Sequence, residues 1–449
     1  MKQLFLVTGL YLLLGVAQAE TVVLDLPQAI ERAMQSDPRI TEKEKLTDAA
    51  RALLQEAEGA KDWIFDVNTF VGLAPTVRGG ITTDGSGNVV IPSNATDVKG
   101  VSPWYRLELA VIKPLHTFGK VENYSRAAKG NIQIKEGDVA LQRSVIAMQV
   151  TRAYNGYLAA RDTRLLLEDT LQKLGVALEL VEKWLANGAG EAKQSDLYAL
   201  QTGAALLRRF IAEASGIEKI AFAGLRLLTG VTNQDQLELA DKRLTPVLMP
   251  EDELAELQSR ALTERPEIRQ LKAGLEARRA WMQAKRSEYY PNVYAGVVGG
   301  ASYVPGREDL SSVTPFDPFD FAGATPVLGV KWDWASGRQP AQVTKAQAEL
   351  ESTLALKSFA QKGIPFEVEE QYQNVHAHRE MVDSMYDASR SSRRWFISVY
   401  ADFEAGVEEP EKIINAMVSY IQSYSEYIRK VNDYNVHVAR LRVVTGEVQ

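Results

Sequence analysis

The feature that most constrains this chain is a run of 68 residues, from Gly119 to Ala186, that contains no proline and is dominated by helix-forming residues. Intrinsic propensities predict one nearly continuous helix over this run. At 1.5 Å per residue, such a helix is roughly 100 Å long. A globular core does not need a helix of this length, so we expect long helices packed side by side.

A second helical segment follows a short turn, Asn187 to Gly190, and returns along the first. Its apolar or small residues recur in alternating steps of three and four, which places them on one helix face. They are Leu197, Leu200, Ala204, Leu207, Ile211 and Ala214. The pattern predicts a long antiparallel coiled-coil hairpin.

The same pattern returns later in the chain at a constant offset of 216 positions. Gly190 corresponds to Gly406, Leu197 to Ile413 and Gly230 to Gly446. A fixed offset held over about 40 residues indicates two internal repeats. The second return segment carries this stripe: Ile413, Met417, Tyr420, Tyr424, Tyr427, Val431, Tyr434, Val438 and Leu441. Aromatic residues at helical period mostly form core, so packing is favoured over a row of tyrosines that binds a ligand.

Composition places the chain among ordered proteins and gives no sign of a nucleic-acid partner. Of the 449 residues, 45% are hydrophobic and 24% are charged, and the net charge is -7. Such a balance argues against disorder and against a nucleic-acid footprint. No cysteine is present, which excludes disulfides and thiolate nucleophiles.

Residues 1–19 are typical of a secretory signal peptide. A lysine precedes an apolar run from Leu4 to Val16, and Ala17-Gln18-Ala19 predicts cleavage before Glu20. The run is short for a spanning helix, which needs about 20 apolar residues. No other stretch reaches that length, so any membrane crossing is expected to use strands.

Four segments, 63–73, 104–112, 292–300 and 327–334, have the character of strands. Three of them alternate between apolar and polar residues, as a strand with one apolar and one polar face does. The predicted apolar, lipid-facing side comprises Leu107, Leu109, Val111, Leu328, Val330 and Trp332. The segment 292–300 is small and apolar throughout. Outer-membrane strands show this alternation, and so do soluble sheets with one buried face.

The number of strands in one chain limits how the protein can assemble in a membrane. Four strands cannot close a barrel, and lipid does not tolerate an open sheet edge. Two copies would supply eight strands and three would supply twelve, of which only the larger barrel leaves room for a conduit. We therefore expect a homo-oligomer, and a trimer in preference to a dimer.

The repeats divide the chain into a signal peptide (1–19), a first repeat (20–230), a linker or equatorial segment (231–251) and a second repeat (252–449). Each repeat opens with a helix that ends before a proline, Pro38 or Pro266, which is expected to begin the next helix. The stretches 74–103 and 301–325 are expected to be long loops. Pro365 is expected to kink or break the second long helix.

The repeated order of elements resembles the TolC-type outer-membrane efflux proteins over essentially the whole mature chain. The resemblance rests on three features: the helical segments around Pro38 and Pro266 that begin the repeats, the strand that ends in Pro114-Leu-His-Thr-Phe-Gly119, and the glycine-containing turns. The resemblance implies a mainly α-helical chain with a transmembrane β-barrel portion of four strands per protomer, twelve in a homotrimer. It also implies an outer-membrane channel-tunnel for efflux or type I secretion. Its partners would be a periplasmic adaptor (membrane fusion protein) and an inner-membrane pump.

The resemblance also assigns residues at the two periplasmic turns. The positions implied for adaptor contact are Gly188, Gly190, Ser195, Asp196, Leu197, Gly406 and Glu411. In the family an acidic residue follows the glycine by six positions, and Asp196 keeps this spacing from Gly190. In the second repeat Lys412 stands there instead, and Asn415 takes the place of a second aspartate. Negative charge near the aperture would then come from Glu408, Glu409 and Glu411, unless these are simply solvated turn residues.

Signals of catalysis are weak. His376 and His378 lie two residues apart, on different faces of a helix, and do not form a metal pair. No glycine-rich segment has the strand-to-helix context of a phosphate site. We therefore expect no enzyme activity, cofactor or metal. A periplasmic coiled-coil scaffold with a soluble β portion is the alternative function.

Overall fold

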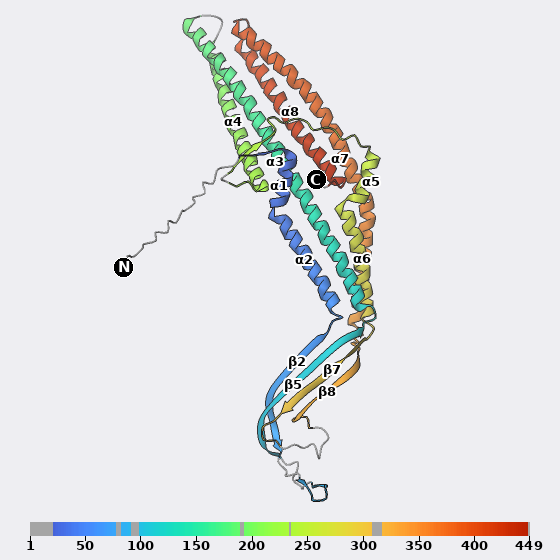
Figure 1. Ribbon diagram of the computed structural model, residues 1–449. Helices are drawn as coiled ribbons and strands as arrows, with labels where there is room; N and C mark the ends of the chain where they lie inside the picture. Colours follow the sequence, from blue (N-terminus) through green and yellow to red (C-terminus); the bar gives the residue numbers. More distant parts are fainter. Residues whose placement is uncertain are drawn as a thin grey trace, which may run out of the picture. The chain divides into compact units, whose positions relative to one another are not determined.

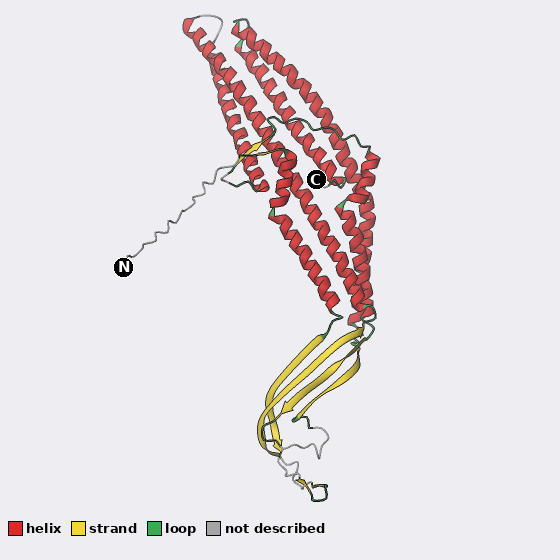
Figure 2. Ribbon diagram, in the orientation of Figure 1, coloured by secondary structure: helices red, strands yellow, loops and turns green. Residues whose placement is uncertain are grey.

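The protein is mainly helical, with one four-stranded sheet (Figures 1 and 2). The computed structural model describes residues 21–77, 82–90, 98–188, 193–232, 235–307 and 317–447. The chain forms two compact units. The first is Met1–Glu44, Gly137–Arg269 and Phe359–Gln449, and the second is Lys45–Glu136 and Gln270–Ser358.

Four helices lie wholly within the first unit: α1 (Leu26–Ser36), α4 (Gln194–Thr229), α5 (Leu254–Glu264) and α8 (Pro410–Val444). Four further helices contribute to both units: α2 (Pro38–Gly59), α3 (Lys120–Asn187), α6 (Pro266–Ser287) and α7 (Arg338–Glu404). The long uninterrupted helix expected from the sequence is α3, with 68 residues.

Pro365 does not end α7, so a break at this residue is wrong, while the alternative that was expected, a kink, stays a prediction. Proline removes one backbone donor from the helix ladder. Its neighbours Ile364 and Val368 are buried in the hydrophobic core, and the Pro365 carbonyl accepts a hydrogen bond of 3.1 Å from Gln258 Nε2. These contacts hold the helix through a residue that its local sequence disfavours.

The return helices pack as predicted. Leu197, Leu200, Ala204, Leu207 and Ala214 of α4 are buried. On α8, Ile413, Met417, Tyr420, Val431, Tyr434, Val438 and Leu441 are buried as well. The tyrosine stripe is therefore mainly core, and the packing interpretation is confirmed.

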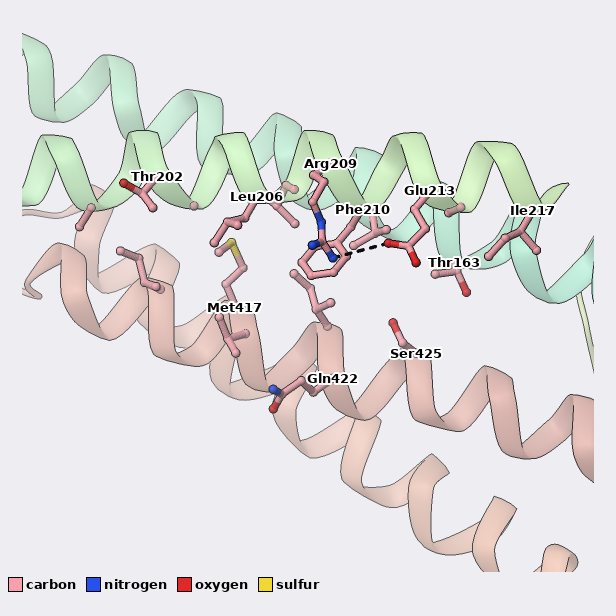
Figure 3. A pocket seen from close by; sticks show the side chains of 18 residues that line it. Thr163, Thr202, Leu206, Arg209, Phe210, Glu213, Ile217, Met417, Gln422 and Ser425 are labelled. Carbon is pink, nitrogen blue, oxygen red and sulfur yellow. Dashed lines mark ion pairs between the residues drawn. The ribbon is translucent and has the colours of Figure 1, made fainter. Parts of the chain in front are cut away.

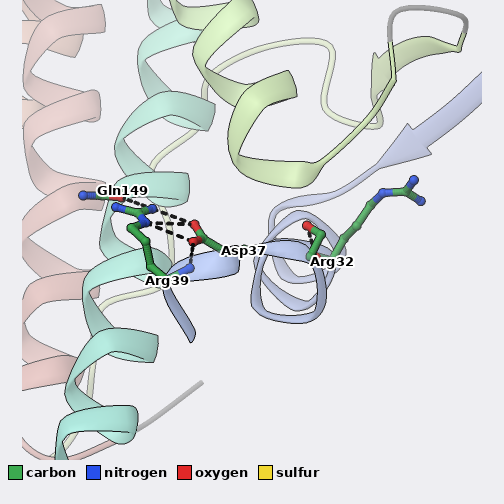
Figure 4. A network of polar contacts seen from close by, with 5 residues as sticks. Arg32, Asp37, Arg39 and Gln149 are labelled. Atoms are coloured by element: carbon green, nitrogen blue, oxygen red, sulfur yellow. Dashed lines mark hydrogen bonds and ion pairs between the residues drawn. The ribbon is translucent and has the colours of Figure 1, made fainter. Parts of the chain in front are cut away.

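At Pro38 and Pro266 new helices begin as expected, and each junction carries an ion pair. We name the α1–α2 junction the first joint. Here Arg39 Nη2 lies 2.6 Å from Asp37 Oδ2 and donates to Gln149 Oε1 of α3 at 2.9 Å (Figure 4). The second joint lies between α5 and α6. There Arg265 pairs with Glu267 at 2.8 Å and with Glu367 of α7 at 2.7 Å.

The segment 231–251, expected as a linker, is held firmly within the first unit. Its strand β6 (Gln236–Leu239) pairs in parallel with β1 (Thr21–Leu24), a ladder that the sequence did not suggest. Leu244 N donates to Asp162 Oδ2 at 2.8 Å, and Asn435 Oδ1 accepts from Val247 N at 2.9 Å. Burial raises the pKa of Asp162.

The sheet belongs to the second unit and has the antiparallel order β2-β5-β7-β8. Its strands are β2 (Ile64–Val77), β5 (Val98–His116), β7 (Asn292–Tyr303) and β8 (Phe321–Lys331). A small hairpin, β3 (Thr82–Thr83) with β4 (Val89–Val90), follows β2. The strands extend into the stretches that were expected as loops. The β2–β5 ladder continues through Pro75, which is opposite Val101, and Pro103, which is opposite Leu73. By contrast, β8 ends one residue before Trp332.

Within the described residues, no helix combines the length and the apolar character that crossing a membrane requires.

Candidate functional site: the two-faced sheet and the hairpin tips

The strand register divides the sheet into two chemically different faces. Pairing aligns Val67 with Leu109, and Leu109 with Gly299. Because side chains alternate across a strand, each such row lies on one face. Five of the six residues predicted to face lipid, Leu107, Leu109, Val111, Leu328 and Val330, fall on the same face. Trp332 lies beyond the end of β8.

This apolar face has large side chains in the open. Leu328 and Val330 are 76% and 64% exposed, and Leu109 is also exposed. Phe65, Val67, Val71 and Leu73 of β2 share the face and are exposed too. Leu107 and Val111 are half-buried. A contiguous apolar surface of this kind marks contact with another protein or with a membrane.

The opposite face carries the charged and amide side chains of β2 and β5, together with apolar and small residues. Arg106 and Glu108 form an ion pair of 2.6 Å, and Asn68 Nδ2 donates to Asp66 Oδ1 at 3.0 Å. These four residues line a hollow of about 540 Å³ that continues over β7 and β8. Charged groups that pair with each other on an open face are suited to contact with water.

The middle of the third strand, β7, carries no charged or amide side chain on this face, where Gly296, Val298 and Gly300 stand between the polar ends Asn292 and Ser302. A Cβ at Gly296 would lie 2.3 Å from the Val111 carbonyl oxygen, and one at Gly300 would lie 2.4 Å from that of Leu107. Close approach of the neighbouring strand β5 therefore demands glycine at these sites. Side chains are therefore absent at these two positions for a steric reason, which explains why the middle of this segment showed no polar face in the sequence.

Among the described residues, the outer strands β2 and β8 each have one neighbour in the sheet. An unpaired strand edge offers free backbone donors and acceptors to another strand. The sheet is therefore open at both sides within one chain.

The first hairpin tip joins α3 to α4. Gly188 follows α3 with a φ of 60°, the left-handed conformation that ends many helices. Asp196 Oδ2 accepts from Lys193 N at 2.8 Å, which caps the beginning of α4. Ser195 is exposed and Leu197 is buried. Gly190 lies outside the described residues.

The second hairpin tip joins α7 to α8. Gly406 has a φ of 75°, and Val407 N donates to Asp402 O at 2.9 Å across the turn. Lys412 Nζ lies 2.7 Å from Glu408 Oε2, and this partner raises the pKa of Lys412. The remaining predicted tip and aperture residues, Glu409, Glu411 and Asn415, are exposed. Their proposed roles stay predictions.

Two side chains that the sequence did not single out connect the hairpins near their tips. The rings of Trp184 on α3 and Phe403 on α7 lie 5.1 Å apart between centroids. Phe403 is fully buried in the core cluster that both hairpins share. Neither residue stands out locally, because their contact joins distant parts of the chain.

An apolar groove of about 780 Å³ runs between α4 and α8 over α3 (Figure 3). Leu206, Phe210 and Ile217 line it from α4, and all three are exposed. Arg209 and Glu213 form an ion pair of 3.5 Å beside it. The groove offers no cluster of catalytic groups. Among the described residues, no group of three or more metal-ligating side chains is placed to hold an ion.

At the level of sequence, neither a family model nor a curated protein matches this chain. Structure gives a different result. Two long helical hairpins and four strands in one chain make up the fold of outer-membrane channels, and the resemblance to the TolC-type proteins is confirmed at the level of fold.

CusC, whose study concerns transmembrane channel formation, aligns over 96% of this chain and 94% of its own, with 17% identity and a TM-score of 0.74. The outer-membrane protein VceC of Vibrio cholerae aligns over 94% and 96%, with 15% identity and a TM-score of 0.70. The CmeC outer-membrane channel of Campylobacter jejuni aligns over 94% and 85%, with 13% identity and a TM-score of 0.74.

Proposed function

We propose that this chain is a passive channel-tunnel in the outer membrane of a Gram-negative bacterium. It would carry substrates from the periplasm to the exterior as part of a tripartite efflux or type I secretion system. The observation that best supports this proposal is the sheet, which has an exposed apolar face, a face with charged residues and two open edges. No catalytic role is proposed.

Three copies of the sheet, joined edge to edge, would form a closed twelve-stranded barrel. Closure pairs the free edges of β2 and β8, and lipid requires every such backbone group to be paired. The apolar face would then contact lipid, and the opposite face, with Arg106 and Glu108, would line water. The exposed apolar groove between α4 and α8 also supports assembly, since burial of such a surface is favourable.

The two hairpin tips would form the periplasmic end of the tunnel. There they would meet a periplasmic adaptor, which is in turn linked to an inner-membrane pump that supplies the energy. Opening would require the tips to move apart, and the Lys412–Glu408 ion pair is one contact that holds the second tip in its present form.

Conductance in planar bilayers tests the proposal. The purified protein is expected to insert as a trimer, and Lys412→Glu is expected to raise its conductance by repelling Glu408. Arg429→Glu is the matched control, because Arg429 is an exposed α8 residue that is likewise paired with a glutamate, Glu426. A trimer that inserts but never conducts, with either variant, contradicts the proposal.

Membrane fractionation separates this function from a periplasmic coiled-coil scaffold. A scaffold would remain in the soluble fraction once its signal peptide is removed. A channel is expected in the outer-membrane fraction and to need detergent for extraction. The exposed Leu328 and Val330 favour the channel, since a soluble scaffold would bury such a face.

A further inference from the structure

Two histidines face each other in the second hairpin. His378 of α7 and His437 of α8 place their ring centroids 4.4 Å apart, with 39° between the ring planes. Both side chains are half-buried. His378 lies between the buried residues Val375 and Val382 along α7, and His437 lies between the buried residues Tyr434 and Val438 along α8, so the pair is part of the contact between these helices.

The surroundings of His378 suit its neutral form, and His437 has an acceptor for a protonated Nδ1 in either form. His437 Nδ1 lies 3.3 Å from Oε1 of Gln371, a residue that is only 2% exposed. His378 Nδ1 is buried and has no hydrogen-bond partner among the described residues. A proton added to this nitrogen would create a buried N–H without an acceptor, which is costly.

The charged groups that act on the pair within the described chain come from the same two helices. Asp433 favours protonation of both rings, and Glu370 favours it at His437. Lys430 opposes it at His378, and Arg440 opposes it at His437. One imidazolium can therefore be balanced by Asp433, whereas two adjacent cations repel each other at this distance.

We propose that His378 and His437 form an acid-sensitive latch that keeps α7 and α8 packed while the rings are neutral and loosens this part of the hairpin when both become charged. The close contact of the two tilted rings and the unpartnered buried nitrogen carry the proposal. It concerns the packing of the hairpin alone and stands whether or not the chain conducts.

The direction of the pH effect follows from burial. Burial lowers the pKa of both imidazoles below the ordinary value, and at His437 the neighbouring His378 lowers it further. The unfolded chain therefore binds protons at a higher pH than the packed hairpin does. The latch contributes fully above about pH 6.5 and weakens as the pH falls below that value.

Hydrogen exchange of the full-length protein in detergent, read by mass spectrometry, tests the latch. Exchange is compared at about pH 7.5 and about pH 5, with labelling times scaled to the intrinsic rate at each pH. Peptides covering 370–385 and 430–441 are expected to exchange at least about fivefold faster at the lower pH. His378→Gln and His437→Gln are each expected to remove most of that increase.

Two controls make the result decisive. His376→Gln changes a histidine on the same helix whose ring contacts Tyr372 instead of another histidine, and it is expected to keep the increase. The first hairpin provides an internal control, because Asp162 and Ala221 occupy the positions that correspond to His378 and His437. The proposal is overturned if wild-type exchange in the two peptides does not change with pH, or if His376→Gln removes the increase equally.

Discussion

The two joints solve one structural problem with opposite charges. At the first joint the acid, Asp37, stands before the proline and the base, Arg39, stands after it. At the second joint Arg265 stands before the proline and Glu267 after it. Each pair is then completed by a residue from a long helix, Gln149 at the first joint and Glu367 at the second.

Both arrangements place a negative charge at the beginning of the next helix, where the helix dipole favours it. Asp37 does so as a cap, since its Oδ1 accepts from Arg39 N at 2.9 Å. Glu267 does so from inside the first turn of α6. The difference teaches that the joint requires a paired carboxylate at this helix terminus, while the order of acid and base along the chain is free.

Loss of a carboxylate should cost more at the second joint, because there the cation is the buried partner, whereas the buried partner at the first joint is the carboxylate of Asp37, which is 6% exposed. The Arg265 side chain is 9% exposed, whereas that of Arg39 is 41% exposed. A buried charge that loses its partners retains its full cost of desolvation. The two joints should therefore respond differently to the same kind of mutation.

The largest expected effect comes from placing a proline in α3 at the position that corresponds to Pro365 of α7. Pro365 of α7 corresponds to Gln149 of α3 at the offset of 216 positions. Gln149→Pro is expected to cost about 3 kcal/mol or more, because it removes a helix hydrogen bond and the contact with Arg39. Thermal unfolding in detergent measures the loss. Pro365→Ala is the reciprocal variant, and a similar destabilisation by both would show that the two helices do not differ in this respect.

Loss of the carboxylates at the second joint ranks next. The double variant Glu267→Gln, Glu367→Gln leaves Arg265 buried without a charged partner and is expected to cost about 3 kcal/mol. Hydrogen exchange of peptides around 261–270 reports the opening of this joint. Replacing Arg265 by Met in the double variant should recover part of the loss, and no recovery would mean that the buried charge was not its source.

At the first joint the matching change is milder. Asp37→Ala removes both the cap and the ion pair and is expected to cost about 2 kcal/mol. Asp37→Asn keeps a capping oxygen and loses only the charge, at about 1 kcal/mol. The same exchange measurement applies to peptides around 33–42. Equal losses in the two variants would show that the cap contributes nothing here.

The sequence was informative wherever a strong period or a proline governed the local structure. The helix from Lys120 to Asn187, the buried residues of α4 and α8, and the helix starts at Pro38 and Pro266 all follow from local pattern. The apolar sheet face followed from alternation. In these cases the residues that specify an element lie within it.

The features that escaped prediction depend on residues far apart in the chain. Arg39 and Gln149 are 110 positions apart, and Arg265 and Glu367 are 102 apart. The short strands β1 and β6 have too few residues for a recognisable pattern. The two faces of β7 could not be recognised from the sequence, because the close approach of β5 requires glycine at positions where a side chain would otherwise mark one face. The histidine pair also joins two helices. The spacing of His376 and His378 along α7 excluded only a pair within that helix and could not reveal the contact with His437 of α8.

Acid should act on the two joints alike and more weakly than mutation does. The Arg39 hydrogen bond lowers the pKa of Asp37. At Glu267, burial alone would raise the pKa, but the Arg265 hydrogen bond, a backbone hydrogen bond and the charge of Arg265 together outweigh it and leave the pKa lowered. Because both folded-state values are depressed, this stabilisation is present above the unfolded pKa values of about 4 and is lost as the pH falls further.

We expect each joint to lose about 0.5–1 kcal/mol of local stability below that pH, an amount typical of partly exposed ion pairs. A brief incubation near pH 3.5, followed by an exchange pulse at neutral pH, measures it. Asp37→Asn should abolish the acid response at the first joint only, and Glu267→Gln should abolish it at the second only. If both joints instead loosened between about pH 6.5 and 5, the carboxylates would not be responsible, because that range lies above their ordinary pKa values of about 4.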